Sequence, residues 1–278
     1  IAEEKNISQA ARKLHMSQPP LSQQLKLMEE ELGVRLVHRE GKKLRLTEAG
    51  EKLYHHAVQV TKLMEEGIEE VKEVGEGLRG TLKLGVNTLS EPSLANFMYE
   101  FRQSYPNVKY EIHQNESKQL CQLLKERNID LAIIRFPVHS EEFSTIQIKR
   151  EPFYFISRQV TEGPITLDTI HTLPIIIPST KGQGLFEYTL KAFVSRKLRP
   201  NIVCECSDLT LLANLVQGGF GSTIVPESAK GIFINKGLHI YLIDEPEMVS
   251  EYGMAWMQKY YLSKVAEKFV KLIKAKIT

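Results

Sequence analysis

The sequence predicts a multidomain α+β protein: a winged helix-turn-helix, then a long linker helix, then a two-lobed α/β domain. Three observations lead to this prediction. Two short helices meet near residues 16 and 17. A seven-residue apolar repeat then runs from residue 53 to residue 78. From Thr81 onward, strand patterns alternate with helix patterns. With 278 residues, the chain is longer than one average domain.

Residues 17–32 carry the start and stop signals of one helix. Ser17 is an expected N-cap, Pro19 and Pro20 fall in the first turn where a missing N–H costs little, and Gly33 follows the last apolar residue. The apolar residues recur every three or four positions and predict one buried face: Leu21, Leu25, Met28 and Leu32. The opposite face is polar near its start.

A second short helix is expected just before it, over residues 7–16. Ser8 is its expected cap, and small or apolar side chains predict its packing side: Ala10, Ala11 and Leu14. Two such helices fit a helix-turn-helix whose second helix enters the major groove of DNA. An ordinary helical hairpin in a globular core is the alternative.

A two-stranded wing is predicted next, from residues 34–39 and 44–46 around a glycine turn. Its cations would lie along the phosphate backbone of DNA, whereas a solvated surface hairpin would need no such partner. Residues 1–47 hold nine Lys and Arg against six acidic residues, although the whole chain carries a formal charge of only +2. A local basic patch on a nearly neutral protein suits a DNA-contacting surface.

A long helix is expected from Thr47, its cap, to about Gly75. Its seam follows a heptad repeat: Leu53, Ala57, Val60, Met64, Gly67, Val71, Val74 and Leu78. A seam this narrow favours pairing with a second copy in a homodimer, which would present two recognition helices to a two-fold operator. Burial against its own chain is the alternative. Gly75, Gly77 and Gly80 are expected to end the helix and form a hinge.

The remaining chain predicts a parallel, doubly wound sheet in two lobes. Strands are expected at residues 82–86, 108–113, 130–134, 153–157, 174–177, 202–206, 222–225 and 249–257, and helices at 90–104, 117–127, 186–196, 209–217 and 263–277. Two crossings, near 158–163 and 244–250, resemble those of periplasmic solute-binding proteins. The expected domains are 1–47, 48–79 and 80–278, with lobe I at about 80–160 and 248–278 and lobe II at about 161–247.

Ligands of open parallel sheets bind beyond the carboxyl ends of the strands, so the residues at these ends form the candidate small-molecule site. They are Asn87, Thr88, Leu89, Ser90, Ser117, Arg135, Pro178, Ser179, Thr180, Ser207 and Asp208. Hydroxyl groups at helix starts suit an anion, and Arg135 could bind a carboxylate in a bidentate pair. The alternatives are ordinary helix caps and, for Arg135, a surface ion pair. Glu116 and Asp208 argue against a strongly cationic cleft.

No cofactor, metal site or catalytic set is expected. The eight histidines lack supporting partners, and no nucleophile elbow or metal-binding spacing occurs. The odd set of cysteines (Cys121, Cys204 and Cys206) favours a reducing compartment, so a cytoplasmic location is expected. No export signal or long apolar run is apparent, so no membrane association is expected.

The first 50 residues resemble the N-terminal signature of LysR-type transcriptional regulators. The matching residues are Ala10, Ala11, Leu14, Ser17, Gln18, Pro19, Leu21, Ser22, Leu25, Glu29, Leu32, Gly33, Leu36, Arg39, Leu46, Thr47, Glu48, Ala49 and Gly50. Pro20 and Val37 depart from the family pattern. The resemblance covers essentially the whole chain and implies one more helix before Ile1, so the sequence is expected to be incomplete at its N-terminus.

This resemblance implies a homo-oligomeric regulator, a homodimer or a homotetramer, that binds double-stranded operator DNA and a small organic acid and works with RNA polymerase. The expected DNA-binding residues are Ser17, Gln18, Pro19, Pro20, Ser22, Gln23 and Lys26 on the helix, and Arg39, Lys42, Lys43 and Arg45 on the wing. Two other classes stay open: a solute-binding protein with a helical appendage, and an α/β enzyme that uses the same cleft.

Overall fold

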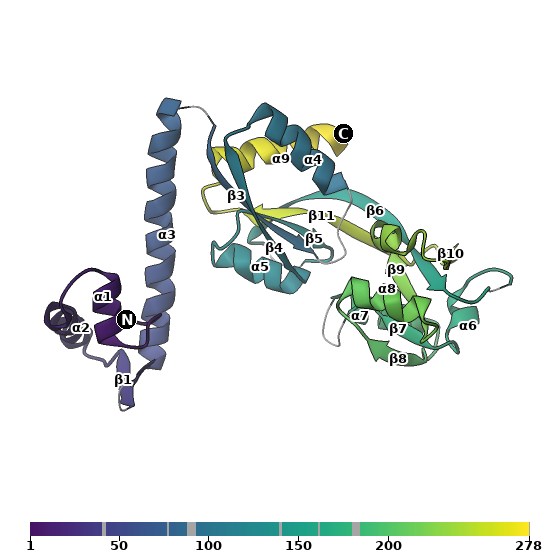
Figure 1. Ribbon diagram of the computed structural model, residues 1–278, viewed down its shortest axis with the longest axis horizontal. Helices are drawn as coiled ribbons and strands as arrows, with labels where there is room; N and C mark the ends of the chain where they lie inside the picture. The colour runs from purple at the N-terminus through teal and green to yellow at the C-terminus, as the bar shows by residue number, and fades with distance from the viewer. Residues whose placement is uncertain are drawn as a thin grey trace. The chain divides into compact units, whose positions relative to one another are not determined.

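The structure of the protein is a computed structural model that describes residues 1–40, 43–76, 78–87, 93–138, 141–160, 162–179 and 184–277. The chain separates into two compact units, Ile1–Glu69 and Glu70–Thr278. The boundary between them falls inside the long helix α3 (Glu48–Glu76), which Figure 1 shows in blue.

Unit 1 begins with α1 (Ile7–Lys13), which is shorter than predicted. Its N-cap is Asn6, not Ser8, because the Asn6 side chain accepts a hydrogen bond of 3.0 Å from the Gln9 backbone N–H. The helix ends before residue 16, since His15 adopts a left-handed φ of 54° that a helix cannot contain.

Helix α2 (Gln18–Leu32) has the predicted ends but not the predicted burial. Ser17 stands at the N-cap position without a capping hydrogen bond from its side chain, and Gly33 ends the helix with a left-handed φ of 67°. Leu21 and Leu25 are half-buried, whereas Met28 and Leu32 are 45% and 50% exposed. The apolar face is therefore covered at its start only, because no described part of unit 1 buries its second half.

The wing is an antiparallel pair of strands, β1 (Val37–Glu40) and β2 (Lys43–Leu46). It starts at Val37 and not at residue 34, because the Glu29 carboxylate of α2 accepts hydrogen bonds from the backbone N–H groups of Leu36 and Val37, at 2.7 and 3.2 Å. These bonds tie the recognition helix to the wing.

Thr47 caps α3 as predicted, because its Oγ1 accepts a hydrogen bond of 3.0 Å from the Gly50 N–H. Gly50 has to be glycine, since a Cβ there would lie 2.0 Å from the Leu36 carbonyl oxygen. Farther along α3, Val60, Met64 and Val71 of the predicted seam are 61%, 64% and 75% exposed in the single chain, and Leu63 and Ile68 widen this apolar strip. The seam does not extend to Leu78, which follows the helix and packs against the core of unit 2.

Unit 2 is built on a nine-stranded sheet in the order β4-β3-β5-β11-β6-β9-β7-β8, with β10 paired to β6. The strands of lobe I are β3 (Gly80–Asn87), β4 (Val108–Asn115), β5 (Leu131–Arg135), β11 (Val249–Met257) and the first part of β6 (Phe143–Ser157). The strands β3, β4 and β5 are parallel, as predicted, whereas β11 and β6 run antiparallel to their neighbours.

Strand β6 belongs to both lobes. It pairs with β11 as far as Pro152, and from Phe153 it pairs with β9 (Ser222–Pro226) instead. The expected crossing at 158–163 was therefore placed too late, and the expected strand at 153–157 is only the second part of β6. Its first part was missed because the consecutive charged residues 149–151 and Pro152 interrupt the strand pattern.

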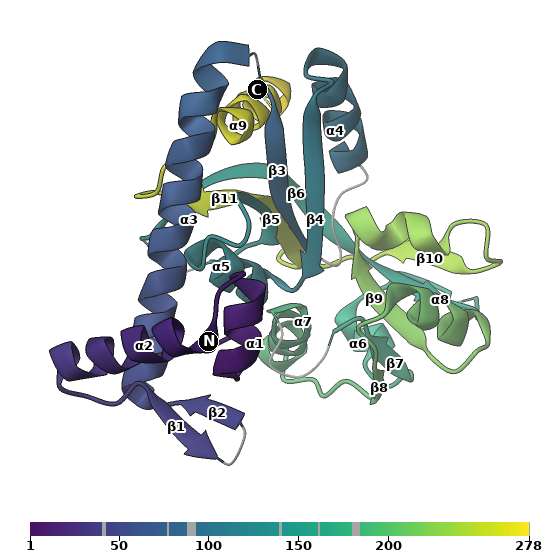
Figure 2. The same ribbon diagram turned by 60° about the vertical axis from the view of Figure 1, so that its left-hand side comes forward.

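Helices cover both faces of the lobe I sheet (Figures 1 and 2). Helices α4 (Ser93–Ser104) and α9 (Lys264–Ile277) lie on one face, where Phe101 and Phe269 meet edge to face at 5.1 Å. Helix α5 (Ser117–Lys125) covers the other face with Leu120 and Leu124. This places the N-terminus of α5 at the carboxyl ends of the strands.

Lobe II has a core of its own, which includes Phe153, Phe155, Phe193 and Phe233. Around the second part of β6 and β9 it contains β7 (Ile175–Ile177), β8 (Ile202–Glu205), β10 (His239–Leu242), α6 (Leu167–Ile170), α7 (Gly184–Ser195), α8 (Leu209–Gln217) and the 3₁₀ helix η1 (Glu227–Phe233). The short elements α6, β10 and η1 were not predicted from the sequence.

Candidate functional site

The start of α2 presents the polar surface that the sequence predicted. Five of its expected DNA-binding residues and the N-cap are exposed: Ser17, Gln18, Pro19, Pro20, Gln23 and Lys26. Ser22 differs, because it is half-buried. Lys26 forms an exposed ion pair with Glu30 of the next turn at 3.3 Å. Such a pair is weak, so it does not prevent Lys26 from binding a phosphate instead.

The wing, which follows α2 in the sequence, contains several basic residues. Arg45 is exposed on β2, opposite His38 of β1. Arg39 and Lys43 belong to the paired strands, but their side chains lie outside the described part of the structure, as does all of Lys42. A basic hairpin next to an exposed amide-rich helix start can bind a phosphate backbone and base edges together.

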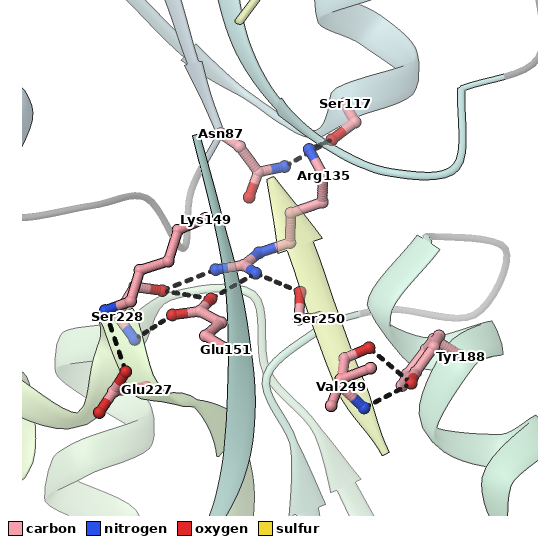
Figure 3. Close-up of polar contacts among 10 residues, drawn as sticks. All are labelled: Asn87, Ser117, Arg135, Lys149, Glu151, Tyr188, Glu227, Ser228, Val249 and Ser250. Atoms are coloured by element: carbon pink, nitrogen blue, oxygen red, sulfur yellow. Dashed lines mark hydrogen bonds and ion pairs between the residues drawn. The ribbon is translucent and has the colours of Figure 1, made fainter. Parts of the chain in front are cut away.

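Unit 2 contains a cavity of about 890 Å³ that residues of both lobes line. Asn87, Ser117 and Arg135, all predicted at strand ends, line it together. The Ser117 hydroxyl oxygen accepts hydrogen bonds from the Asn87 amide at 3.0 Å and from the Arg135 backbone N–H at 2.9 Å (Figure 3). The strand ends and the start of α5 are thereby joined into one polar wall.

The Arg135 side chain is already bound within the protein. Its Nη1 lies 2.7 Å from Glu151 Oε1 in an ion pair whose side chains are 10% and 0% exposed. Its Nη1 also donates to the Ser250 hydroxyl, and its Nη2 donates to the Ser228 hydroxyl at 2.7 Å (Figure 3). The alternative of a surface ion pair was therefore right about the pairing and wrong about its place, because the ion pair of Arg135 is buried.

Glu116 lies next to Ser117 on the same wall. Burial raises the pKa of its carboxyl above the ordinary value of 4.5, although Arg135 and a hydrogen bond from Asn87 act in the opposite direction.

The other walls of the cavity are apolar and basic. The lining includes aromatic and aliphatic side chains: Phe136, Val138, Phe143, Phe153, Leu185, Tyr188 and Met248. Two of the cations in the lining are paired with acids, Lys125 with Glu142 and Arg196 with Glu245. Lys118 of α5 and Lys191 of α7 also line the cavity, and within the described residues neither forms an ion pair.

The other predicted strand-end residues that the structure describes do not line this cavity. Pro178 and Ser179 are buried, and Asp208 caps α8 by accepting a hydrogen bond of 2.7 Å from the Leu211 N–H. Ser207 is exposed outside the cavity. Thr88, Leu89, Ser90 and Thr180 lie outside the described residues. A ligand-binding role for these eight residues therefore stays a prediction.

Sequence reasoning missed Lys118, Lys191, Glu151 and Ser228. Lys118 could have been found, because it follows Ser117 at the start of a helix that begins after a strand. Glu151 and Ser228 gave no such signal, since their roles depend on contacts with Arg135 across 16 and 93 residues of sequence.

Neither metal ligands nor membrane spans were found in the described ranges. No three His, Cys, Asp or Glu residues there are grouped so that they could hold a metal ion. None of the described helices is long and apolar enough to cross a membrane. Burial raises the pKa of the Cys121 and Cys206 thiols, which disfavours the reactive thiolate.

A winged helix-turn-helix with an exposed polar helix start, followed by a two-lobed domain around a cavity, defines a ligand-responsive DNA-binding protein. Comparisons with known proteins identify its family. Residues 1–51 match the family described as "Bacterial regulatory helix-turn-helix protein, lysR family", and residues 75–278 match the "LysR substrate binding domain". The chain belongs to the LysR family of transcriptional regulators.

Similar proteins cover nearly the whole chain. The HTH-type transcriptional regulator BsdA of Bacillus subtilis (strain 168) is 32% identical, over 98% of this chain and 96% of its own length. AlsR of the same organism is 30% identical, over 92% and 86%. The crystal structure of full-length CbnR complexed with its target DNA shares the fold, with a TM-score of 0.74 at 21% identity, over 99% of this chain and 95% of that one.

Proposed function

We propose that this LysR-type regulator binds its operator through the start of α2 and the basic wing, and that an organic acid in the cavity of unit 2 changes this binding. The effector proposal is based on two lysines that line the same cavity, Lys118 in lobe I and Lys191 in lobe II. Neither has an ionic partner among the described residues. An acid held between Lys118 and Lys191 would favour one lobe geometry over another, and such a preference is what allows a ligand to shift a conformational equilibrium.

The cavity chemistry favours an acid with an apolar body over a small polyanion. Five basic residues face four glutamates along the lining, so the net charge there is small. Arg135 is held by Glu151, which leaves the lysines as the groups that attract a carboxylate. The aromatic and aliphatic wall would bury a ring or a hydrocarbon chain, as is typical of small-molecule sites.

The test is a thermal-shift screen in which each organic acid is paired with its own amide. We expect the hits to be acids whose amides give no shift, and we expect each shift to be lost in Lys118→Gln and Lys191→Gln. Lys271→Gln, an exposed change on α9 outside the cavity lining, should retain the shift. Equal binding of acids and amides, or hits that both lysine variants retain, would exclude this effector chemistry.

The proposal includes the DNA-binding residues Ser17, Gln18, Pro19, Pro20, Ser22, Gln23 and Lys26 on the helix and Arg39, Lys42, Lys43 and Arg45 on the wing. Glutamine amides can pair with adenine edges in the major groove, whereas the wing cations would bind phosphates. On an operator selected from genomic fragments, hydroxyl-radical footprinting tests the backbone contacts and missing-base interference tests the base contacts. Protection limited to phosphates, with no base contact near α2, would remove α2 as the reading element.

Two copies, or two pairs of copies, would assemble through the exposed apolar strip of α3 (Val60, Leu63, Met64, Ile68 and Val71). Such a strip is unusual on a monomer and suits a partner helix. The oligomer would act in the cytoplasm together with RNA polymerase and without catalysing a reaction on its effector. Analytical ultracentrifugation checks the assembly, and incubation with any screening hit followed by mass spectrometry checks for turnover.

A further inference from the structure

The contacts of Arg135 cross from one lobe to the other at the point where β6 changes partners. Arg135 ends β5 in lobe I, and Glu151 lies on β6 just before the strand leaves β11 for β9. Ser228 belongs to η1, whose Phe233 and Ala229 are part of the lobe II core. A guanidinium from lobe I therefore binds a hydroxyl of lobe II directly, and both groups donate to the same Glu151 carboxylate (Figure 3).

Glu151 is the centre of this cluster because both of its oxygens are used. Oε1 accepts from Arg135 Nη1 at 2.7 Å and from the Ser228 hydroxyl at 2.9 Å. Oε2 accepts from the Ser228 backbone N–H at 2.8 Å. A fully buried carboxylate requires such partners, since leaving water without them is strongly unfavourable. One buried carboxylate thus fixes three donor groups: the Arg135 guanidinium of lobe I, and the hydroxyl and backbone N–H of Ser228 in lobe II.

We propose that Glu151 and Ser228 are positioning residues that fix the orientation of lobe II relative to lobe I by holding the Arg135 guanidinium in the cavity wall. A nearby pair, Lys149 with Glu227 at 3.0 Å, also joins β6 to η1, but its side chains are 43% and 31% exposed. Exposed pairs contribute little, so the buried cluster rather than this pair determines the orientation. The consequence for the effector rests on the proposed function, because the same wall lines the proposed effector cavity.

The chain offers a direct measurement of the distance between the lobes. Trp256, the single tryptophan, lies on β11 in lobe I. Val203, which is 42% exposed on β8 of lobe II, is a suitable labelling position. Cys121→Ala, Cys204→Ala and Cys206→Ala remove the native thiols, and Val203→Cys then accepts one fluorescent acceptor. Time-resolved energy transfer from Trp256 reports the distribution of distances without effector or DNA.

In the otherwise unaltered protein, we expect one narrow distribution of distances. Ser228→Ala, which removes two side-chain hydrogen bonds but leaves the ion pair, should broaden this distribution, and Glu151→Gln should broaden it further. Glu227→Gln, on the neighbouring residue of η1, should leave it unchanged. Circular dichroism checks that each labelled variant is folded, and Ser228→Ala keeps the test decisive should Glu151→Gln fail to fold.

A narrow, unshifted distribution in folded Ser228→Ala would overturn the proposal, as would equal broadening in Glu227→Gln. The second readout is the concentration of a screening hit that gives half of the maximal thermal shift. It should rise at least threefold in Ser228→Ala, while the limiting shift at saturation stays that of the parent protein. Because the distance measurement needs no ligand, its outcome is independent of whether the effector is an organic acid.

Discussion

The two units of this chain use polar side chains in opposite ways. In unit 1, the polar residues at the start of α2 lie exposed on a regular helix, where an outside partner can reach them. In unit 2, Arg135 stands at an expected ligand position but is 90% buried in its own contacts with Glu151, Ser228 and Ser250. The comparison teaches that position in the fold predicts a binding residue only where its side chain is not already used to hold the fold together.

We expect the greatest loss of stability when the buried ion pair of Arg135 and Glu151 is removed. Arg135→Ala leaves the Glu151 carboxylate buried without its cation, which typically costs about 3–5 kcal/mol. Urea unfolding followed by circular dichroism should therefore show unit 2 strongly destabilised. Lys149→Ala, which removes one partner of an exposed pair, should cost less than about 1 kcal/mol. Equal stability of Arg135→Ala and the unaltered protein would show that the ion pair does not hold the lobes.

The next prediction concerns DNA binding by the exposed glutamines at the start of α2. Gln18→Ala and Gln23→Ala should each weaken binding to the preferred operator by about 1–3 kcal/mol while affecting unrelated DNA much less, because a bidentate amide contact discriminates between bases. Glu31→Gln, an exposed change near the other end of α2, is the matched control. Fluorescence anisotropy with both DNA sequences measures the ratio. An equal loss on both sequences would assign the glutamines to the backbone.

A smaller effect distinguishes phosphate contacts from base contacts. Lys42→Ala and Lys43→Ala should each lower the slope of log affinity against log salt concentration by about 1, because each removes one released counterion. Sequence preference should stay the same. An unchanged slope in the double variant would place the wing away from DNA.

The smallest effect concerns Glu116 and is a dependence on pH. Since its pKa is raised in the folded protein, the folded state holds the proton more tightly than the unfolded state does. The free energy of unfolding should therefore fall as pH rises from the ordinary pKa of 4.5 through the raised value. Glu116→Gln should lack this fall and be the more stable protein at neutral pH. Urea titrations at a series of pH values check the sign, and a fall of equal size in the variant would contradict it.

Local signals predicted most of unit 1 and the order of elements in unit 2. The Gly33 cap, the Thr47 cap and the helices α1 and α2 depend on neighbours within a few residues, so the sequence contains them. The corrections follow from contacts that sequence cannot display. Glu29 sets the start of the wing from seven residues away, and β6 joins the two lobes through partners about 70 to 100 residues later. The sequence also could not show that Arg135 is already bound, since Glu151 and Ser228 come near it only in the fold. Arg135 was therefore expected to bind a ligand.

The most direct test of the account is selection of genomic DNA fragments by the full chain, followed by titration of the enriched sequence over a range of salt concentrations. We predict that one sequence with two-fold symmetry is enriched. Its affinity for the protein should fall steeply as the salt concentration rises, and it should change when an organic acid from the screen is added. Enrichment of no sequence, or binding that is indifferent to both salt and acid, would contradict it.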